Sequence, residues 1–430
     1  MRKSVLSVIF YLILLPSLYS QSRWIDLQSI PLLPSDRYED MFFINSQTGY
    51  VVHISGKIYK TTNGGRTFAL RSTRTGAFYR SIGFFDENTG FVGTLTDSLP
   101  MLRTTNGGIN FTKITNISGP SILNICGISV VNSTTAYAVG RYFCPAYFVK
   151  TTDKGESWTS VSVDPLMIKS IVDCHFWSAD SGIVVGGYNP SNVFSISNSV
   201  VLFTSNGGQS FSTVFKSTRT GEWGWKISFV NKLTGFVSVE SLNRAVVLKT
   251  TNAGMNWTER VFTTTEDLEG IGFINENTGW IGGWEGPTYQ TTNSGASWVQ
   301  VPWGRYLNRF RFISDTLGYA IGSSFYKFTQ ESVSIQQISS EMPGRINLYQ
   351  NYPNPFNPET RINYEMRLTD LVTLKIFNAL GVEIKTLVNE IQKPGIYSAS
   401  FDGSDYPSGI YYYKLETAEY SDSKKMVLVK

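Results

Sequence analysis

A short motif that recurs at a nearly constant interval constrains the fold of this chain more than any other feature. The motif reads Thr-x-Asn/Asp-x-Gly-x-x-Trp/Phe, and its six copies start 43, 47, 53, 46 and 41 residues apart. The copies are Thr61–Phe68, Thr104–Phe111, Thr151–Trp158, Thr204–Phe211, Thr250–Trp257 and Thr291–Trp298. A repeat of about 40–50 residues that holds several short strands has the size of one β-propeller blade.

Each copy, here called a box, has the chemistry of a tight turn. Asn or Asp tolerates a left-handed backbone, Gly supplies a positive φ, and the Thr hydroxyl can satisfy turn amides. The aromatic residue is expected to be buried between neighbouring sheets, which stabilises the fold by about 2–3 kcal/mol each. We assign this structural role, and no catalytic one, to Thr61, Asn63, Gly65, Phe68, Thr104, Asn106, Gly108, Phe111, Thr151, Asp153, Gly155, Trp158, Thr204, Asn206, Gly208, Phe211, Thr250, Asn252, Gly254, Trp257, Thr291, Asn293, Gly295 and Trp298.

A second pattern predicts one more blade than there are boxes. A polar turn, usually followed by Gly and an aromatic residue, occurs seven times, as in "NSQTGY" (Asn45–Tyr50) and "NENTGW" (Asn275–Trp280). The stretch "SRWIDLQSI" near the N-terminus resembles the strand that follows each box, with Trp24 in the aromatic position. We therefore expect this strand to complete a last blade built from about 309 to 328. Such closure leaves no open edge between the chain ends. The predicted fold is all-β: a seven-bladed propeller followed by a small Ig-like antiparallel sandwich.

The boxes resemble the Asp-box repeats of bacterial neuraminidases. Together with the "NENTGW"-type turns, they resemble the photosystem II assembly-factor-like propellers over about 23–328. Most copies here have Asn where the named box has Asp, and Ala136 replaces the turn Gly of the third blade. The resemblance is specific for the fold and implies little about function, because such propellers serve many ends.

The chain ends predict an exported protein. Residues 1–20 have a basic start, an apolar run and a small residue at the end, which is typical of a signal peptide too short to span a bilayer. The propeller is expected over 21–330, a polar linker over 331–346 and a sandwich over 347–430. No integral membrane span is expected. Neither Cys126, Cys144 and Cys174 nor the two histidines fit a metal pattern, and no metal or cofactor is predicted. One disulfide and buried free thiols both stay open.

The C-terminal stretch carries several motifs in order. They are "YPNPFNP" (Tyr352–Pro358), "IFNALGVEI" (Ile376–Ile384), "SGIYYYKL" (Ser408–Leu415) and a basic, apolar tail. The three prolines of the first motif exclude a central strand there. The module closely resembles the type A sorting domain of the type IX secretion system. This resemblance implies that the type IX machinery and its sortase are partners, and that the protein reaches the outer-membrane surface or the medium through the periplasm. The alternative is an ordinary accessory sandwich.

The pentapeptide "STRTG" occurs twice, at Ser72–Gly76 and Ser217–Gly221. Both copies are expected in links between blades, on the face opposite the boxes, with aromatic and basic residues nearby. Aromatic rings stack on sugars or peptide side chains, and Arg offers forked donors. We predict a ligand-binding face at the channel mouth, made of Arg74, Tyr79, Arg80, Arg219, Trp223, Trp225, Trp284, Trp303 and Arg305. The alternative is that "STRTG" is only a repeated turn.

The sequence favours a non-catalytic binder of a polysaccharide or a protein at the cell surface. A structural or assembly scaffold is the first alternative, and a sialidase-like or xyloglucanase-like glycoside hydrolase is the second. Glu222, Glu269 and Glu285 could supply acids on the same face, but no motif places a nucleophile and a base together. A net charge of +4, scattered along the chain, gives no reason to expect nucleic acid as a partner.

Overall fold

The computed structural model describes residues 22–33, 35–140, 145–189, 193–241, 244–262, 267–284, 286–330, 336–339, 343–404 and 406–430. The predicted signal peptide lies outside these residues. Two compact units divide the described chain after Thr329. Among the described residues, no helix is long and apolar enough to cross a membrane.

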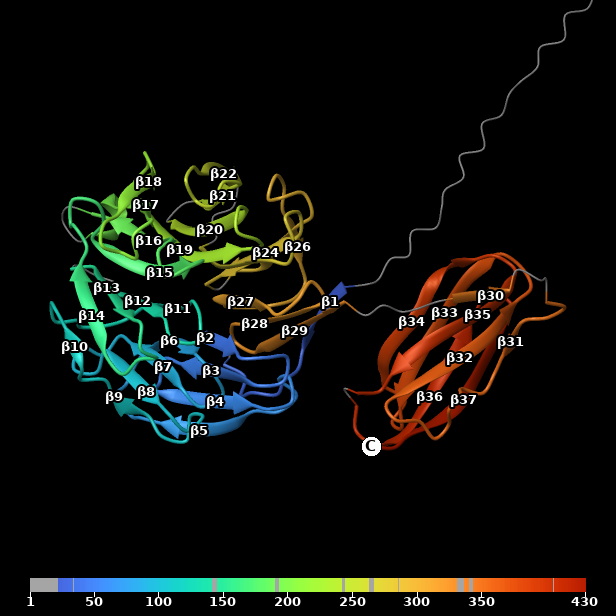
Figure 1. The fold of residues 1–430 in the computed structure, drawn as a ribbon. Coiled ribbons are helices and arrows are strands. Elements are labelled where there is room, and N and C mark those ends of the chain that lie inside the picture. Colours follow the sequence, from blue (N-terminus) through green and yellow to red (C-terminus); the bar gives the residue numbers. More distant parts are fainter. Residues whose placement is uncertain are drawn as a thin grey trace, which may run out of the picture. The chain divides into compact units, whose positions relative to one another are not determined.

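The first unit is a ring of β-sheets (Figure 1), and seven sheets belong to it in the described part of the chain. Blade 1 holds β2 (Tyr38–Phe43), β3 (Gly49–His53), β4 (Lys57–Thr61) and β5 (Ala69–Thr73); blade 2 holds β6 (Tyr79–Phe84), β7 (Gly90–Thr94), β8 (Met101–Thr104) and β9 (Thr112–Lys113); blade 3 holds β10 (Ile117–Ser118), β11 (Gly127–Val130), β12 (Ala136–Gly140), β13 (Tyr147–Thr151) and β14 (Trp158–Ser162). Blade 4 holds β15 (Ser170–Phe176), β16 (Gly182–Tyr188), β17 (Asn198–Thr204) and β18 (Ser212–Lys216), with the short 3-10 helix η1 (Phe194–Ile196) before β17; blade 5 holds β19 (Glu222–Phe229), β20 (Gly235–Ser241), β21 (Ala245–Thr250) and β22 (Thr258–Phe262). Blade 6 holds β23 (Leu268–Phe273), β24 (Gly279–Gly283), β25 (Thr288–Thr291) and β26 (Val299–Val301); blade 7 holds β27 (Arg309–Phe312), β28 (Leu317–Ile321), β29 (Phe325–Gln330) and β1 (Ser22–Asp26).

The N-terminal strand closes the ring, as predicted. In blade 7 the strand order is β1-β29-β28-β27, so the first strand of the unit lies beside its last. The Leu27 amide donates to the Phe325 carbonyl at 3.1 Å. Trp24 stacks on Trp303 at 4.6 Å between ring centroids and meets Trp280 edge-on at 5.4 Å. Burial of these aromatic rings stabilises the packing of the first strand against the rest of blade 7, and so closes the ring.

Neighbouring blades pack through apolar clusters that draw residues from both. Phe43 of blade 1 stacks on Tyr319 of blade 7 at 3.9 Å, and Phe236 of blade 5 stacks on Phe273 of blade 6 at 3.5 Å. Blade 3 differs from the rest, because β10 from the preceding link pairs in parallel with its outermost strand β14. The ring is therefore held by repeated sheet-to-sheet burial rather than by one central core.

Each box closes the turn between the third and fourth strands of its blade. In the first box, the Gly65 amide donates to the Thr61 hydroxyl at 3.0 Å, and the Thr67 amide donates to the Asn63 side-chain oxygen at 3.0 Å. The Gly–Thr bond recurs at 2.9–3.0 Å in the other five boxes. Gly65 has φ +84°, and a Cβ there would lie 2.3 Å from the Phe325 ring of the neighbouring blade. Glycine is thus required both by the turn and by the close approach of the next sheet.

The alternating chain direction gives the ring two different faces. The boxes and the first-to-second-strand turns lie on one face, here called the box face. The links between blades and the second-to-third-strand loops lie on the other, here called the link face. The first "STRTG" copy covers the last two residues of β5 and enters the link before β6, and the second copy lies wholly in the link before β19. Their last residues, Gly76 and Gly221, have φ +80° and +73°. The repeated pentapeptide therefore forms the same kind of corner, which needs a residue that accepts a positive φ.

The second unit is an antiparallel β-sandwich. One sheet has the order β30-β35-β32-β31 and the other β34-β33-β36-β37. Its strands are β30 (Gln336–Ser339), β31 (Asn347–Leu348), β32 (Glu359–Met366), β33 (Asp370–Asn378), β34 (Glu383–Gln392), β35 (Gly395–Asp402), β36 (Gly409–Glu416) and β37 (Ser421–Leu428). Burial alternates along β32, and the unit has an apolar core of its own. Within the segment expected as a linker, β30 adds a strand to the edge of β35.

Candidate functional site

The axis of the ring is lined by buried charges. The innermost strand of every blade except the third carries at least one charged side chain that is at most 4 % exposed. Besides Glu222 at the start of β19, which pairs with Arg219 of the preceding link, they are Glu39 and Asp40 on β2, Arg80 on β6, Asp173 on β15, Lys226 on β19, Glu269 on β23 and Arg309 on β27. Burial of an ionised side chain costs much free energy unless opposite charges or hydrogen bonds compensate it. These side chains must therefore compensate one another across the channel, and we call them the channel network.

Arg309 joins three blades. Its Nε donates to Asp40 Oδ1 at 2.8 Å, and its two terminal nitrogens donate to the oxygens of Asp173 at 2.8 and 3.2 Å. Blade 7, which holds Arg309, is not adjacent to blade 4, which holds Asp173, so the guanidinium spans the axis. Burial alone would raise the pKa of Asp173, but the charge and hydrogen bonds of Arg309 lower it to about 2. Asp173 is thus held ionised in the interior.

A second chain of ion pairs runs beside the first. Arg80 bonds to Glu39, and Arg37 bonds to Glu269. Arg37 Nε also lies 3.5 Å from Glu39 Oε1, which links the two pairs. Arg37 belongs to the link that leads from β1 to β2, so the closing strand and the channel network are connected along the chain.

Lys226 has no partner in this network. It is fully buried, and its Nζ makes no hydrogen bond. The nearby oxygens are taken, because Asp173 accepts bonds from Arg309 and from the Ile227 amide, and Asp40 from Arg309 and the Ile82 amide. Burial, together with the charges of Arg309 and Arg80, lowers the pKa of Lys226 well below its usual range. The ammonium form is therefore disfavoured in the folded state.

Replacing Lys226 with methionine is expected to raise the free energy of unfolding at pH 7 by about 1–3 kcal/mol. The unfolded chain carries the charged amine, whereas the folded chain must bury it; methionine of similar length removes this penalty and breaks no hydrogen bond. Since the folded pKa is depressed, the gain should shrink as the pH rises towards about 10.4 and should be smallest above this value, where the unfolded lysine has also lost its proton. Urea unfolding at pH 7 and 10.5 measures both effects. A loss of stability in Lys226→Met would show that the amine is paired.

Trp225 closes the channel on the side of the link face. A bulge in β19 between Gly224 and Ile227 interrupts its pairing with β20. The indole Nε1 of Trp225 lies 3.4 Å from Asn308 Oδ1 of the link into blade 7, and Arg80 of blade 2 lies over the ring at 5.2 Å. One side chain of blade 5 thus touches residues of two distant blades and fills the axis.

Four of the predicted ligand contacts are buried. Tyr79, Arg80, Trp223 and Trp225 are at most 4 % exposed, because they belong to innermost strands and not to the links that precede them. These side chains cannot form part of an exposed contact surface in this structure; they pack between sheets or fill the axis.

The arginines of the two "STRTG" corners have different surroundings. The Arg219 guanidinium is bonded to Glu222 at 2.6 and 3.2 Å and to Glu259 twice at 2.5 Å, so its forked donors are already used. Hydrogen bonding to Glu259, and then to Glu222, raises the pKa of Arg219. Arg74 is exposed and donates to the Phe111 carbonyl at 3.3 Å. The second corner is therefore an ion-paired brace, and the first is open to solvent.

The remaining predicted contacts lie on the link face around blades 6 and 7. Trp284 follows β24 and is 41 % exposed, with the Arg37 guanidinium over its ring at 4.7 Å. Tyr306 meets Trp284 edge-on at 5.3 Å, and the exposed Arg305 lies 5.2 Å over Tyr306. Trp303 is half-buried against Trp24. Glu285 and Cys144 lie outside the described residues, and Cys126 and Cys174 are buried.

Three carboxyl groups meet beside Trp284. Oxygens of Glu240, Asp267 and Glu269, here called the acid cluster, lie within 4.8 Å of one another. Glu240 Oε2 and Asp267 Oδ1 are buried and have no hydrogen-bond partner. Burial and the charge of Glu269 raise the pKa of Asp267 to about 7, and burial with both neighbouring carboxylates raises the pKa of Glu240. Burial, together with the crowding of like charges, thus keeps protons in the cluster at neutral pH.

Replacing Asp267 with asparagine should stabilise the ring more at pH 8 than at pH 5. The folded pKa of about 7 lies above the unfolded value of 3.8, so wild-type stability falls as the pH rises through this window. The asparagine side chain does not titrate, so the variant does not lose stability through this window. Urea unfolding at both pH values tests this, with the exposed Asp315→Asn as the control. An Asp267→Asn effect that does not change with pH would contradict the raised pKa.

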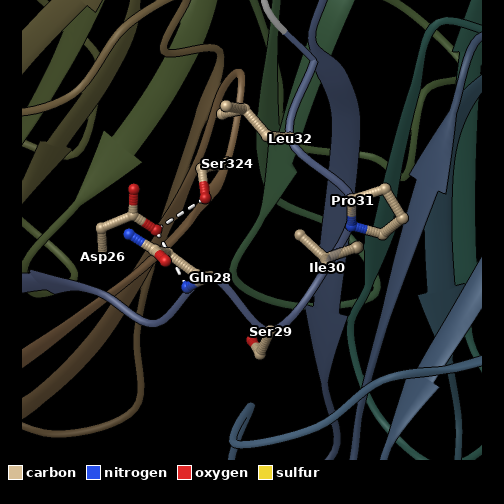
Figure 2. Close-up of a pocket in the computed structure, with 7 residues that line it drawn as sticks. All are labelled: Asp26, Gln28, Ser29, Ile30, Pro31, Leu32 and Ser324. Carbon is tan, nitrogen blue, oxygen red and sulfur yellow. Dashed lines mark hydrogen bonds between the residues drawn. The ribbon is translucent and has the colours of Figure 1, made fainter.

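A pocket opens on the link face where the ring closes (Figure 2). It has a volume of about 520 Å³ and is lined by Asp26, Gln28, Ser29, Ile30, Pro31, Leu32 and Ser324. The link that follows β1 supplies most of the lining, and the β28–β29 loop supplies Ser324.

Sequence reasoning missed the channel network, the acid cluster and this pocket. One signal was available for the first: a charged residue interrupts most of the apolar innermost strands, as in "YEDMFF" (Tyr38–Phe43) and "LEGIGF" (Leu268–Phe273). No comparable signal marked the pocket, since its lining residues come from an irregular link.

Comparisons with known proteins agree with this architecture. Residues 350–430 match the family described as the secretion system C-terminal sorting domain, which confirms the resemblance predicted for the tail. A search of curated proteins finds no significant match. Among solved structures, YCF48 bound to a D1 peptide shares 17 % identity at a TM-score of 0.53, over 73 % of this chain and 98 % of that one. YCF48 from Cyanidioschyzon merolae shares 16 % identity at a TM-score of 0.54, over 71 % and 98 %.

An ancestral GH74 enzyme is also similar in structure. It shares 11 % identity at a TM-score of 0.51, over 93 % of this chain and 63 % of that one. At such identities the comparisons show the propeller fold alone. The chain is thus a β-propeller protein whose C-terminal sorting domain directs it through the type IX secretion system to the cell surface or the medium.

Proposed function

We propose that the ring is a non-catalytic module that binds a polysaccharide or a protein at the cell surface. The observation that carries the proposal is Trp284, whose ring is 41 % exposed on the link face and lies next to Tyr306, Arg37 and the acid cluster. An exposed aromatic ring beside hydrogen-bonding groups suits both sugars and peptide side chains. Because the axis is filled by Trp225 and the channel network, the ligand would lie across the link face and not enter the channel.

One comparison supports a protein as the ligand. YCF48, a ring of the same fold, has been solved with a D1 peptide bound. An identity of 17 % shows a shared fold and not a shared ligand, so peptide binding by this chain is tested separately.

The secreted form, collected from culture medium or released from cells, should be screened on glycan and protein arrays. We expect retention of at least one polysaccharide or protein class, with no product released from the glycans that are retained. Absence of retention on both arrays would favour a scaffold role and contradict the proposal.

The acid cluster favours a glycoside hydrolase as the second candidate. Glycosidases use two carboxyl groups, about 5–5.5 Å apart in retaining enzymes, with one of them kept protonated. Glu240 and Asp267 are close enough and have raised pKa values. Incubation of the secreted form with a glycan panel, followed by detection of new reducing ends, separates the two functions. Turnover that Glu240→Gln abolishes would favour the hydrolase.

A further inference from the structure

We infer that the pocket at the ring closure is a saccharide subsite, which takes one or two sugar units through their hydroxyl groups. The inference rests on the proposed binding function and assigns a second contact point on the same face. The pocket volume of about 520 Å³ falls within the range of roughly 300–1,000 Å³ that is usual for small-molecule sites.

The polar side of the pocket offers unused hydrogen-bonding groups. Asp26 Oδ1 accepts bonds from the Gln28 amide at 3.0 Å and from the Ser324 hydroxyl at 2.7 Å. These bonds fix the carboxylate and leave its second oxygen available. Figure 2 shows the Gln28 side chain beside this carboxylate, and Ser29 Oγ is buried without a hydrogen-bond partner. A carboxylate accepts hydrogen bonds from sugar hydroxyls, and a primary amide and a hydroxyl both donate hydrogen bonds to them and accept hydrogen bonds from them.

The apolar side suits the C–H face of a sugar ring. Ile30, Pro31 and Leu32 follow one another along the link (Figure 2). Ile30 is only 4 % exposed, so the exposed Pro31 and Leu32 would make the contact. Leu32 is 64 % exposed at this edge. Covering its side chain would remove apolar surface from water, which favours binding by about 25 cal/mol per Å².

The link is held in shape before any ligand binds. The Leu27 amide donates to the Phe325 carbonyl, the Leu33 amide donates to the Ser323 carbonyl at 2.8 Å, and the Tyr38 hydroxyl donates to the Pro31 carbonyl at 2.7 Å. A preformed pocket avoids the entropy cost of ordering a loop on binding.

The backbone of Gln28 has a left-handed conformation, which is energetically unfavourable for any residue with a side chain. Its φ is +47°, in the left-handed region that favours glycine. The left-handed corner itself does not need the side-chain amide, because glycine adopts this conformation without strain. The same fact supplies a clean variant: Gln28→Gly removes the amide and suits the backbone.

The test uses the secreted form and saturation-transfer NMR with cellobiose, maltose, N,N′-diacetylchitobiose and α-1,3-mannobiose. At least one disaccharide should bind, and Gln28→Gly and Asp26→Asn should each weaken it at least about tenfold. The control is Ala253→Gly, at another left-handed position (φ +57°) on the box face, which should bind as wild type. Melting temperatures of both glycine variants should not fall.

Two results would overturn the inference. If no disaccharide binds wild type, the pocket is not a saccharide subsite, even when protein ligands are retained and the proposed function stands. If a disaccharide binds equally well to Gln28→Gly and Asp26→Asn, it binds elsewhere on the ring.

Discussion

Replacing Arg309 with methionine is expected to lower the free energy of unfolding by about 3–5 kcal/mol. The variant leaves Asp40 and Asp173 buried without their shared cation, and both are at most 2 % exposed. In the wild-type structure Lys226 makes no hydrogen bond to either carboxylate, and Arg311 lies 3.8 Å from Asp40. The effect should be large because one side chain connects blades 1, 4 and 7 across the axis. Urea unfolding followed by tryptophan fluorescence measures it.

The matched control is Arg74→Met, since Arg74 is exposed and contacts a carbonyl and the Tyr79 hydroxyl rather than a buried carboxylate. It should change stability by less than about 0.5 kcal/mol. A second variant, Arg309→Met with Asp173→Leu, tests the cause. This double variant should recover part of the lost free energy of unfolding, because it removes one of the two buried carboxylates that Arg309→Met leaves without a cation. Equal effects of Arg309→Met and Arg74→Met would show that the channel network contributes little.

Deleting residues 343–430 is expected to remove the protein from the cell surface and the medium completely, while the ring stays folded. The C-terminal unit matches the sorting-domain family and has its own apolar core. The ring is a separate compact unit that closes on itself through β1 and β29. Loss of the tail therefore removes the export signal without opening a sheet of the propeller. Immunoblots of periplasm, cell surface and medium measure the distribution.

The deleted chain should accumulate in the periplasm with the melting temperature of the mature ring. The control is a chain of full length with Leu368→Ala in the tail, an exposed position between β32 and β33 that lies outside the quoted motifs, leaves the sandwich core intact and should be exported. Delivery of the deleted chain to the surface would mean that the signal lies in the propeller. Degradation with a lowered melting temperature would mean that the ring depends on the tail.

The repeats made most of the fold predictable. In a box, Thr61 and Gly65 must be four residues apart because the Thr61 hydroxyl accepts a hydrogen bond from the Gly65 amide. The pattern is therefore local and can be recognised in the sequence. The count of seven followed from Trp24, whose strand had no box of its own. The tail was predictable for a different reason, since its motifs are specific to one family.

The site was much less predictable, because its contacts join residues that no periodicity relates. Arg309 and Asp173 are 136 residues apart and meet only because their blades face each other across the axis. Trp225 was expected at the surface, but a bulge in β19 lies at this point and its indole fills the channel. Arg219 was expected to bind a ligand, yet Glu259 on the outermost strand of the same blade takes its donors. Such pairings depend on tertiary geometry.

Ligand retention by two matched variants of the secreted form tests the central claim most directly. Trp284→Ala changes an exposed residue of the link face, and Leu233→Ala changes an exposed residue of a box-face turn. The ligand retained by wild type on the arrays should be lost, by at least about tenfold in affinity, only from Trp284→Ala. Loss of retention from Leu233→Ala, with Trp284→Ala binding as wild type, would place the binding surface on the other side of the ring and contradict the account.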